Sequence, residues 1–117
     1  MARARRERGR LLGDYENQLA LQLKLTGHNV VTELRFADGR RFRFDVALPA
    51  HMLAVEVDGG CFSGGRHVSA SGIRAEHEKS YLAALYGWRV IHVLPEDVRC
   101  GVALARIERV IRGVEAE

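Results

Sequence analysis

Two short segments near the middle of the chain alternate apolar and charged residues with a period of two, and they lie on either side of a proline. The first reads RFRFDVAL (residues 41–48) and the second reads LAVEVD (residues 53–58), with PAHM between them. Alternation over this length predicts two β-strands. A connection of four residues allows them to pair only as antiparallel neighbours. This pairing constrains the fold more than any other feature of the chain.

Both strands carry acidic residues on the face opposite to their apolar side chains. In the first, Phe44 and Val46 point one way and Asp45 the other, and in the second Val55 alternates with Glu56. If the turn is centred between residues 50 and 51, antiparallel pairing places Asp45 directly opposite Glu56. Two carboxylates in this position repel each other unless a cation lies between them, and oxygen ligands suit Mg²⁺ or Mn²⁺. The alternative is an exposed face with ordinary charges, which a one-residue shift in register would produce.

The remaining pattern predicts a single α/β domain with a mixed sheet. Gly27 and Gly87 follow two helical segments, and Asp38-Gly39 is a strong signal for a hairpin turn. The expected order is α-β-β-β-α-β-α. The expected helices are residues 12–25, 73–86 and 101–113, and the expected strands are residues 29–36, 41–48, 53–58 and 88–94.

The length of the chain fits one domain, because 117 residues with 47% hydrophobic content can bury one core. We expect this domain to cover residues 11–117 and a basic arm to precede it over residues 1–10. No apolar run reaches the roughly 20 residues of a membrane span, and the first residues lack the apolar core of a signal peptide. We therefore expect a cytoplasmic protein with no membrane partner.

The excess positive charge of the chain lies in its first ten residues. They hold five arginines and one glutamate, whereas the rest of the chain holds 13 basic and 14 acidic residues. Arginines grouped in this way are typical of contacts with a DNA backbone, and a solvated tail is the alternative. The candidate DNA-binding arginines of the arm are Arg3, Arg5, Arg6, Arg8 and Arg10.

The acidic strand pair is part of a longer similarity. Asp45, ten further residues and EVDGG from Glu56, followed by EHEKSYLAALYGWRVIHVLPEDV, resemble the PD-(D/E)XK nuclease superfamily. Within it, the chain is most similar to phage replication-repair and very-short-patch-repair-like enzymes and to archaeal-type Holliday junction resolvases. The resemblance covers about residues 16–98. It implies a restriction-endonuclease-like fold with an α-β-β-β-α-β core, and an Mg²⁺-dependent DNA endonuclease for which Mn²⁺ substitutes.

The same resemblance implies roles for individual residues. Asp45 and Glu56 would be metal ligands together with the main-chain carbonyl of Val57, and Glu16 would contribute directly or through water. For Glu16, a plain surface carboxylate on a helix is the alternative.

One position departs from the family pattern. The family usually has a lysine two residues after the glutamate, and this chain has Asp58 there. Some members carry the lysine on the following helix, where this chain has Lys79. Only two of its 18 basic residues are lysines, so Lys79 stands out. The alternative is a surface lysine paired with a helix carboxylate such as Glu76. In either case, Asp58 is expected to be a further metal ligand or a hydrogen-bonding partner for the glycine-rich loop that follows it.

The glycine-rich segment after the second strand does not match a nucleotide-binding fingerprint, so we expect no nucleotide cofactor. Arg66, His67 and Arg74 in and beside it are candidate contacts to phosphate. The chain has no separate sequence-reading domain, which favours branched DNA recognised by shape, and a homodimer would cut two strands symmetrically. We therefore expect a Holliday junction resolvase. The alternatives are a nicking repair endonuclease of the very-short-patch type and a catalytically inactive nucleic-acid-binding module.

Overall fold

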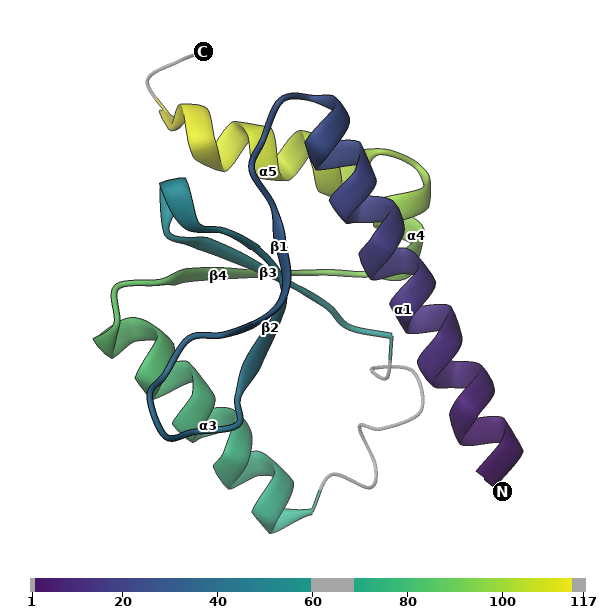
Figure 1. The fold of residues 1–117 in the computed structure, drawn as a ribbon, viewed down its shortest axis with the longest axis vertical. Coiled ribbons are helices and arrows are strands. Elements are labelled where there is room, and N and C mark those ends of the chain that lie inside the picture. Colours follow the sequence, from purple (N-terminus) through teal and green to yellow (C-terminus); the bar gives the residue numbers. More distant parts are fainter. Residues whose placement is uncertain (1, 60–68, 115–117) are drawn as a thin grey trace.

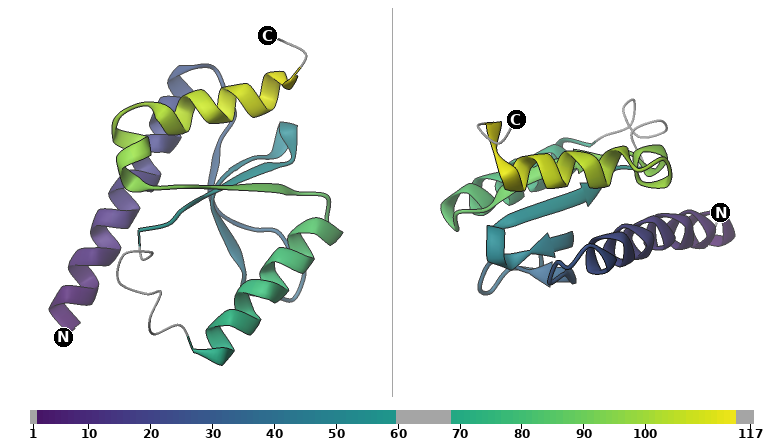
Figure 2. Two further views of the ribbon diagram at one scale, coloured as in Figure 1. Left: turned by 180° about the vertical axis from the view of Figure 1, so that it is seen from behind. Right: turned by 90° about the horizontal axis from the view of Figure 1, so that it is seen from above.

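The computed structural model describes residues 2–59 and 69–114, and it describes side chains from residue 13 onward. Figure 1 shows a sheet flanked by helices, and Figure 2 shows the same fold from behind and from above. The elements are α1 (Ala2–Leu25), β1 (Val31–Arg35), β2 (Arg43–Leu48), η1 (Pro49–His51), β3 (Leu53–Val57), α3 (Ala70–Leu85), β4 (Arg89–Val93), α4 (Pro95–Arg99) and α5 (Val102–Arg112).

The four strands form one mixed sheet in the order β1-β2-β3-β4. The pairs β1–β2 and β2–β3 are antiparallel, whereas β3 and β4 pair in parallel. Val46 pairs with Val55 and Leu48 pairs with Leu53, which confirms the register predicted from the proline turn. The turn itself is the short helix η1, and Met52 closes it with a φ of 48°.

Helices cover both faces of the sheet. On one face, α1, α4 and α5 enclose a core, and the buried residues of this core are Leu19, Leu23, Val46, Leu48, Leu53, Val55, Val57, Val93, Val98, Ala103 and Ile107. On the other face, α3 packs over a smaller core that contains Phe44, Ala47, Ala54, Leu82 and Ala83. Because α5 buries Ala103 and Ile107 in the first core, this helix covers the sheet.

The alternation of side chains in β2 breaks at Asp45. Phe44 packs in the core beneath α3, whereas Val46 packs in the core beneath α1 and α5. Side chains two residues apart on a regular strand share a face, so the prediction that Phe44 and Val46 point the same way is wrong. Glu33, opposite this position on β1, has a φ of 54°, and the pairs on either side of it keep one register. The irregularity is therefore local to the Glu33–Asp45 position.

The helix boundaries also differ from the sequence prediction. The first helix begins at Ala2 and not at Leu12, because the arginines and alanines of the basic segment are good helix formers. The second begins at Ala70, where the Ser69 hydroxyl accepts a hydrogen bond from the Gly72 N–H at 3.0 Å. Sequence analysis missed α4, which is only five residues long. Within the described residues, no helix is long and apolar enough to cross a membrane.

Candidate active site

The end of the β2–β3 ladder brings Asp45 and Glu56 together. Continuing the observed register by one residue places them opposite each other. Here side chains replace the backbone ladder: the Asp45 N–H donates to Glu56 Oε2 at 3.0 Å, and the Val57 N–H donates to Asp45 Oδ2 at 2.9 Å. Each carboxylate therefore accepts a hydrogen bond from the opposite strand, which fixes both side chains where the strands separate.

Lys79 reaches this pair from α3. Its Nζ donates to Glu56 Oε1, and it lies 5.8 Å from the centre of the Phe44 ring. The Lys79 and Glu56 side chains are only 18% and 8% exposed. The structure thus pairs this lysine with Glu56 on the sheet, and not with Glu76 of its own helix, the partner named in the alternative. Burial raises the pKa of Glu56, and the hydrogen bonds from Lys79 and from the Asp45 N–H oppose this rise.

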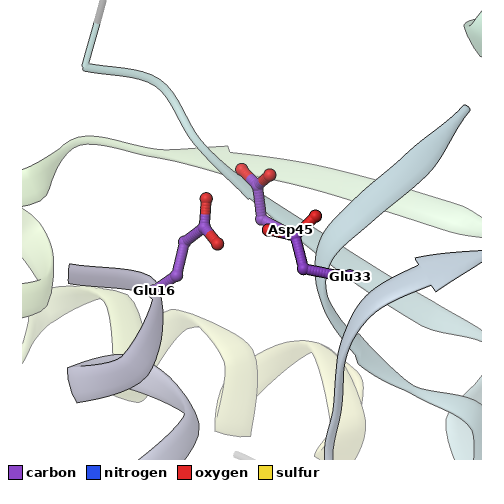
Figure 3. Close-up of side chains that lie close together, drawn as sticks. All are labelled: Glu16, Glu33 and Asp45. Carbon is purple, nitrogen blue, oxygen red and sulfur yellow. The ribbon is translucent and has the colours of Figure 1, made fainter. Parts of the chain in front are cut away.

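Asp45 also belongs to a group of three carboxylates. Figure 3 shows Glu16 from α1 and Glu33 from β1 beside Asp45, and one oxygen of each lies within 4.8 Å of the others. Burial, the Asp45 charge and a hydrogen bond to Glu33 raise the pKa of Glu16 to about 8. Glu33 was missed in the sequence because it lies in an ordinary alternating strand. Its positive φ, which turns it toward Asp45, depends on the folded sheet.

This group fits a hard divalent cation, because it offers carboxylate oxygens only and a positive ion would relieve their mutual repulsion. Glu56 is outside the group, and both of its oxygens accept hydrogen bonds. The sequence placed the Asp45 and Glu56 carboxylates on one charged face, but the structure turns Asp45 toward Glu16 of α1 and Glu56 toward Lys79 of α3. A metal ion shared by Asp45, Glu56 and the Val57 carbonyl stays a prediction.

A second polar pair lies next to Glu56. His92 pairs with Glu56 across the parallel β3–β4 ladder, and its Nδ1 lies 2.7 Å from Asp58 Oδ2. Asp58, at the position of the usual family lysine, is therefore the hydrogen-bonding partner of a histidine. His92 lines a pocket of about 130 Å³ together with Glu56, Lys79 and Glu76. Sequence analysis did not select His92, because a single histidine in an apolar strand carries no distinctive pattern.

The predicted phosphate contacts are less well defined. Arg74 lies exposed near the start of α3 and has no ion-pair partner among the described side chains. Arg66 and His67 lie outside the described residues. The backbone of residues 2–10 forms the first turns of α1, and the side chains of the five arginines predicted to bind DNA there are not described.

The fold and the site together define a mixed α/β protein with a group of carboxylates and a lysine at the end of its central strand pair. No family model, no curated protein and no solved structure matches the chain. Its function is therefore argued from the site itself.

Proposed function

We propose that this chain is an Mg²⁺-dependent endonuclease that hydrolyses phosphodiester bonds in DNA. The observation that carries the proposal is the set of hydrogen bonds that joins Asp45, Glu56 and Lys79 at the end of the β2–β3 ladder: the Asp45 N–H donates to Glu56, the Val57 N–H donates to Asp45, and Lys79 donates to Glu56. The acidic pair and the lysine come from separate elements, yet hydrogen bonds link them into one site. This arrangement and the element order support a restriction-endonuclease-like fold within the PD-(D/E)XK superfamily.

The acidic residues would hold the metal. Glu16, Glu33 and Asp45 offer oxygens close enough to share one ion, and Glu56 is the neighbouring acidic ligand suggested by the resemblance. When bound, Mg²⁺ or Mn²⁺ would act as a Lewis acid toward the phosphate and lower the pKa of a water molecule. The high pKa of Glu16, caused by burial and by Asp45, is the electrostatic cost that a cation would remove.

Lys79 would supply a second positive charge at the site, in addition to that of the metal ion. In the proposed reaction, a water molecule attacks phosphorus in line with the bond to the 3′-oxygen. That bond breaks and leaves a 5′-phosphate and a 3′-hydroxyl. The Lys79 ammonium, held by Glu56 and packed near Phe44, would orient the attacking water and offset the negative charge that develops on the phosphate. Lys79 would thus replace the family lysine at the position that Asp58 occupies.

The preferred substrate is proposed to be branched DNA, a Holliday junction cut by a homodimer. A nicking repair endonuclease of the very-short-patch type is the alternative among enzymes. An inactive DNA-binding module is the alternative among non-enzymes, and its main support is the missing family lysine. The contact of Lys79 with Glu56 weakens that support, because it brings a lysine to the acidic pair by another route.

The test is a panel of linear, nicked, flapped and four-way DNAs incubated with Mg²⁺ or with EDTA. We expect Mg²⁺-dependent cleavage of the four-way junction, lost in Asp45→Asn and reduced at least about 100-fold in Lys79→Met. Lys24→Met is the matched control, because Lys24 is the only other lysine and is exposed at the end of α1. Mg²⁺-independent binding without cleavage of any substrate would favour the inactive module.

A further inference from the structure

The β1–β2 hairpin carries a group of arginines that the site described above does not use. Between Arg35 and Arg43 the chain has four arginines and a single acidic residue, Asp38. Residues at the tip of this hairpin border an open, shallow hollow of about 410 Å³. The residues that line the hollow are Arg35, Ala37, Asp38, Gly39, Arg40 and Arg41. Three positive charges and one negative charge therefore face the same small space.

Two of these arginines have no ion-pair partner among the residues that the structure describes. Arg43 lies 3.7 Å from Glu33, and Arg40 pairs with Glu78 of α3. In contrast, the structure gives the guanidinium groups of Arg35 and Arg41 no hydrogen-bond or ion-pair partner among the described residues. Both side chains are exposed. A guanidinium group forms bidentate hydrogen bonds with phosphate oxygens. Two arginines that lack an ion-pair partner among the described residues and lie beside one hollow therefore favour a phosphate-bearing ligand.

The hairpin holds these arginines on a rigid base. The Phe36 and Phe44 rings stack with their centres 3.9 Å apart, and the Arg40 guanidinium lies 5.1 Å from the centre of the Phe42 ring. The turn is closed by the Arg40 N–H, which donates to the Ala37 carbonyl at 3.2 Å. A preformed base of this kind lowers the entropy that binding would otherwise cost.

The hairpin also lies next to the candidate active site. Figure 1 shows the β1–β2 connection beside α3, and Arg40 bonds to Glu78, the residue that precedes Lys79. Asp45 lies four positions after Arg41, which is roughly 13 Å along an extended chain. A linear polyanion bound at Asp45 and Lys79 would therefore meet the hairpin if it continued along β2. Among the described residues, none of the exposed large apolar side chains lies between residues 35 and 43, which argues against insertion into a lipid surface.

We propose that the arginine-lined hollow of the β1–β2 hairpin, through Arg35 and Arg41, binds the phosphodiester backbone of the nucleic acid that the active site cleaves. The proposal rests on the proposed nuclease function for the identity of the ligand. The contacts are to phosphates, so they position the strand and add affinity without selecting a base sequence. Loss of both arginines should therefore weaken binding to all DNA sequences alike.

The test measures binding alone. The 117-residue chain and its Arg35→Ala/Arg41→Ala variant are titrated with fluorescent 30-base-pair and four-way DNAs in EDTA over a range of salt concentrations. Arg99→Ala/Arg106→Ala is the matched control, because it removes two exposed arginines from α4 and α5, which cover the other face of the sheet from α3. Each lost phosphate contact lowers the slope of log affinity against log salt by about 0.9, so we expect a decrease of about 2 for the hairpin variant. If the two proteins bind equally at 1 M salt, the hairpin variant should bind about 60-fold more weakly than the wild-type protein at 0.1 M salt, and the control should stay within about twofold of the wild-type protein.

Three results would overturn the proposal: an unchanged slope, an equal loss in the control, or a loss of binding to phosphatidylserine vesicles while DNA binding stays the same. Because cleavage is not measured, the two proposals fail separately. If the protein cuts no DNA but binds it through the hairpin, only the nuclease function is refuted. If it cuts DNA but its DNA affinity does not depend on Arg35 and Arg41, only the hairpin site is refuted.

Discussion

Replacing Lys79 with methionine tests the central contact of the site through stability as well as activity. The variant keeps most of the apolar stem near Phe44 but removes the positive charge that Glu56 faces. Glu56 is then left as an acidic residue that is only 6% exposed. Removing one partner of a buried ion pair costs about 3–5 kcal/mol. Since Lys79 keeps 18% exposure, we expect a loss of about 2–3 kcal/mol at pH 8.

The loss should depend on pH in a defined direction. Burial raises the pKa of Glu56 above its ordinary value of 4.5, and Lys79 is one of the groups that limits the rise. Without Lys79, the folded protein holds the Glu56 proton to higher pH while the unfolded chain releases it near its ordinary pKa. The stability of the variant therefore falls as pH increases from about 4.5 through the raised pKa of the folded state. We expect a loss of only about 1 kcal/mol at pH 5.

The assay is chemical and thermal unfolding of the wild-type protein, Lys79→Met and Lys24→Met at pH 5 and pH 8. For a chain of this size, the expected loss at pH 8 lowers Tm by roughly 10 °C. The double variant Glu56→Gln/Lys79→Met should regain most of the lost stability, because a neutral side chain replaces the unpaired carboxylate. Its stability loss should also be the same at the two pH values. A loss no larger than that of Lys24→Met, or one equal at the two pH values, would refute the view that Lys79 neutralises a buried Glu56.

Three further predictions concern the acidic group and its support. The pKa of Glu16 is raised to about 8, so the metal-free protein should lose stability as pH rises from about 4.5 to 8. Millimolar Mg²⁺ should restore Tm at pH 8. A Tm that depends on neither pH nor Mg²⁺ would contradict the metal site. Glu33→Gly relieves a positive φ and a neighbouring charge, so calorimetry should show about 1–2 kcal/mol more stability without Mg²⁺ but a smaller gain on adding it. Phe44→Ala removes the fully buried ring that stacks on Phe36, and denaturant titration should show a loss of about 3–5 kcal/mol.

The sequence predicts the sheet well because its signals there are local. The period-two pattern and the short proline turn determine which strands pair, and the register that follows places Asp45 opposite Glu56. Lys79 stands out in the sequence because lysine is rare in this chain and because it lies on the helix after the strand pair, and the structure brings it to Glu56; its catalytic role stays a prediction. Helix α4 was missed because five residues carry too little periodicity to recognise.

Glu33 and His92 could not be predicted because their roles depend on neighbours that are distant in the chain. Glu33 meets Glu16 of α1 only after β1 joins the sheet, and it does so with a backbone conformation that no sequence pattern signals. His92 meets Asp58 only through the parallel pairing of β4 with β3, which a long connection makes. Both residues lie in strands whose alternation alone indicates ordinary sheet positions.

The irregular features of this fold meet at one position. Glu33 adopts a left-handed backbone, the side-chain alternation of β2 breaks at the residue opposite it, and Asp45 there faces two other carboxylates. Each of these features costs stability, since a left-handed non-glycine residue costs about 1–3 kcal/mol and clustered negative charges repel. A regular strand with apolar residues at 33 and 45 would avoid all of them. Such costs persist where they position side chains for binding or chemistry, so their coincidence at Asp45 is an argument for a functional site that is independent of any family resemblance.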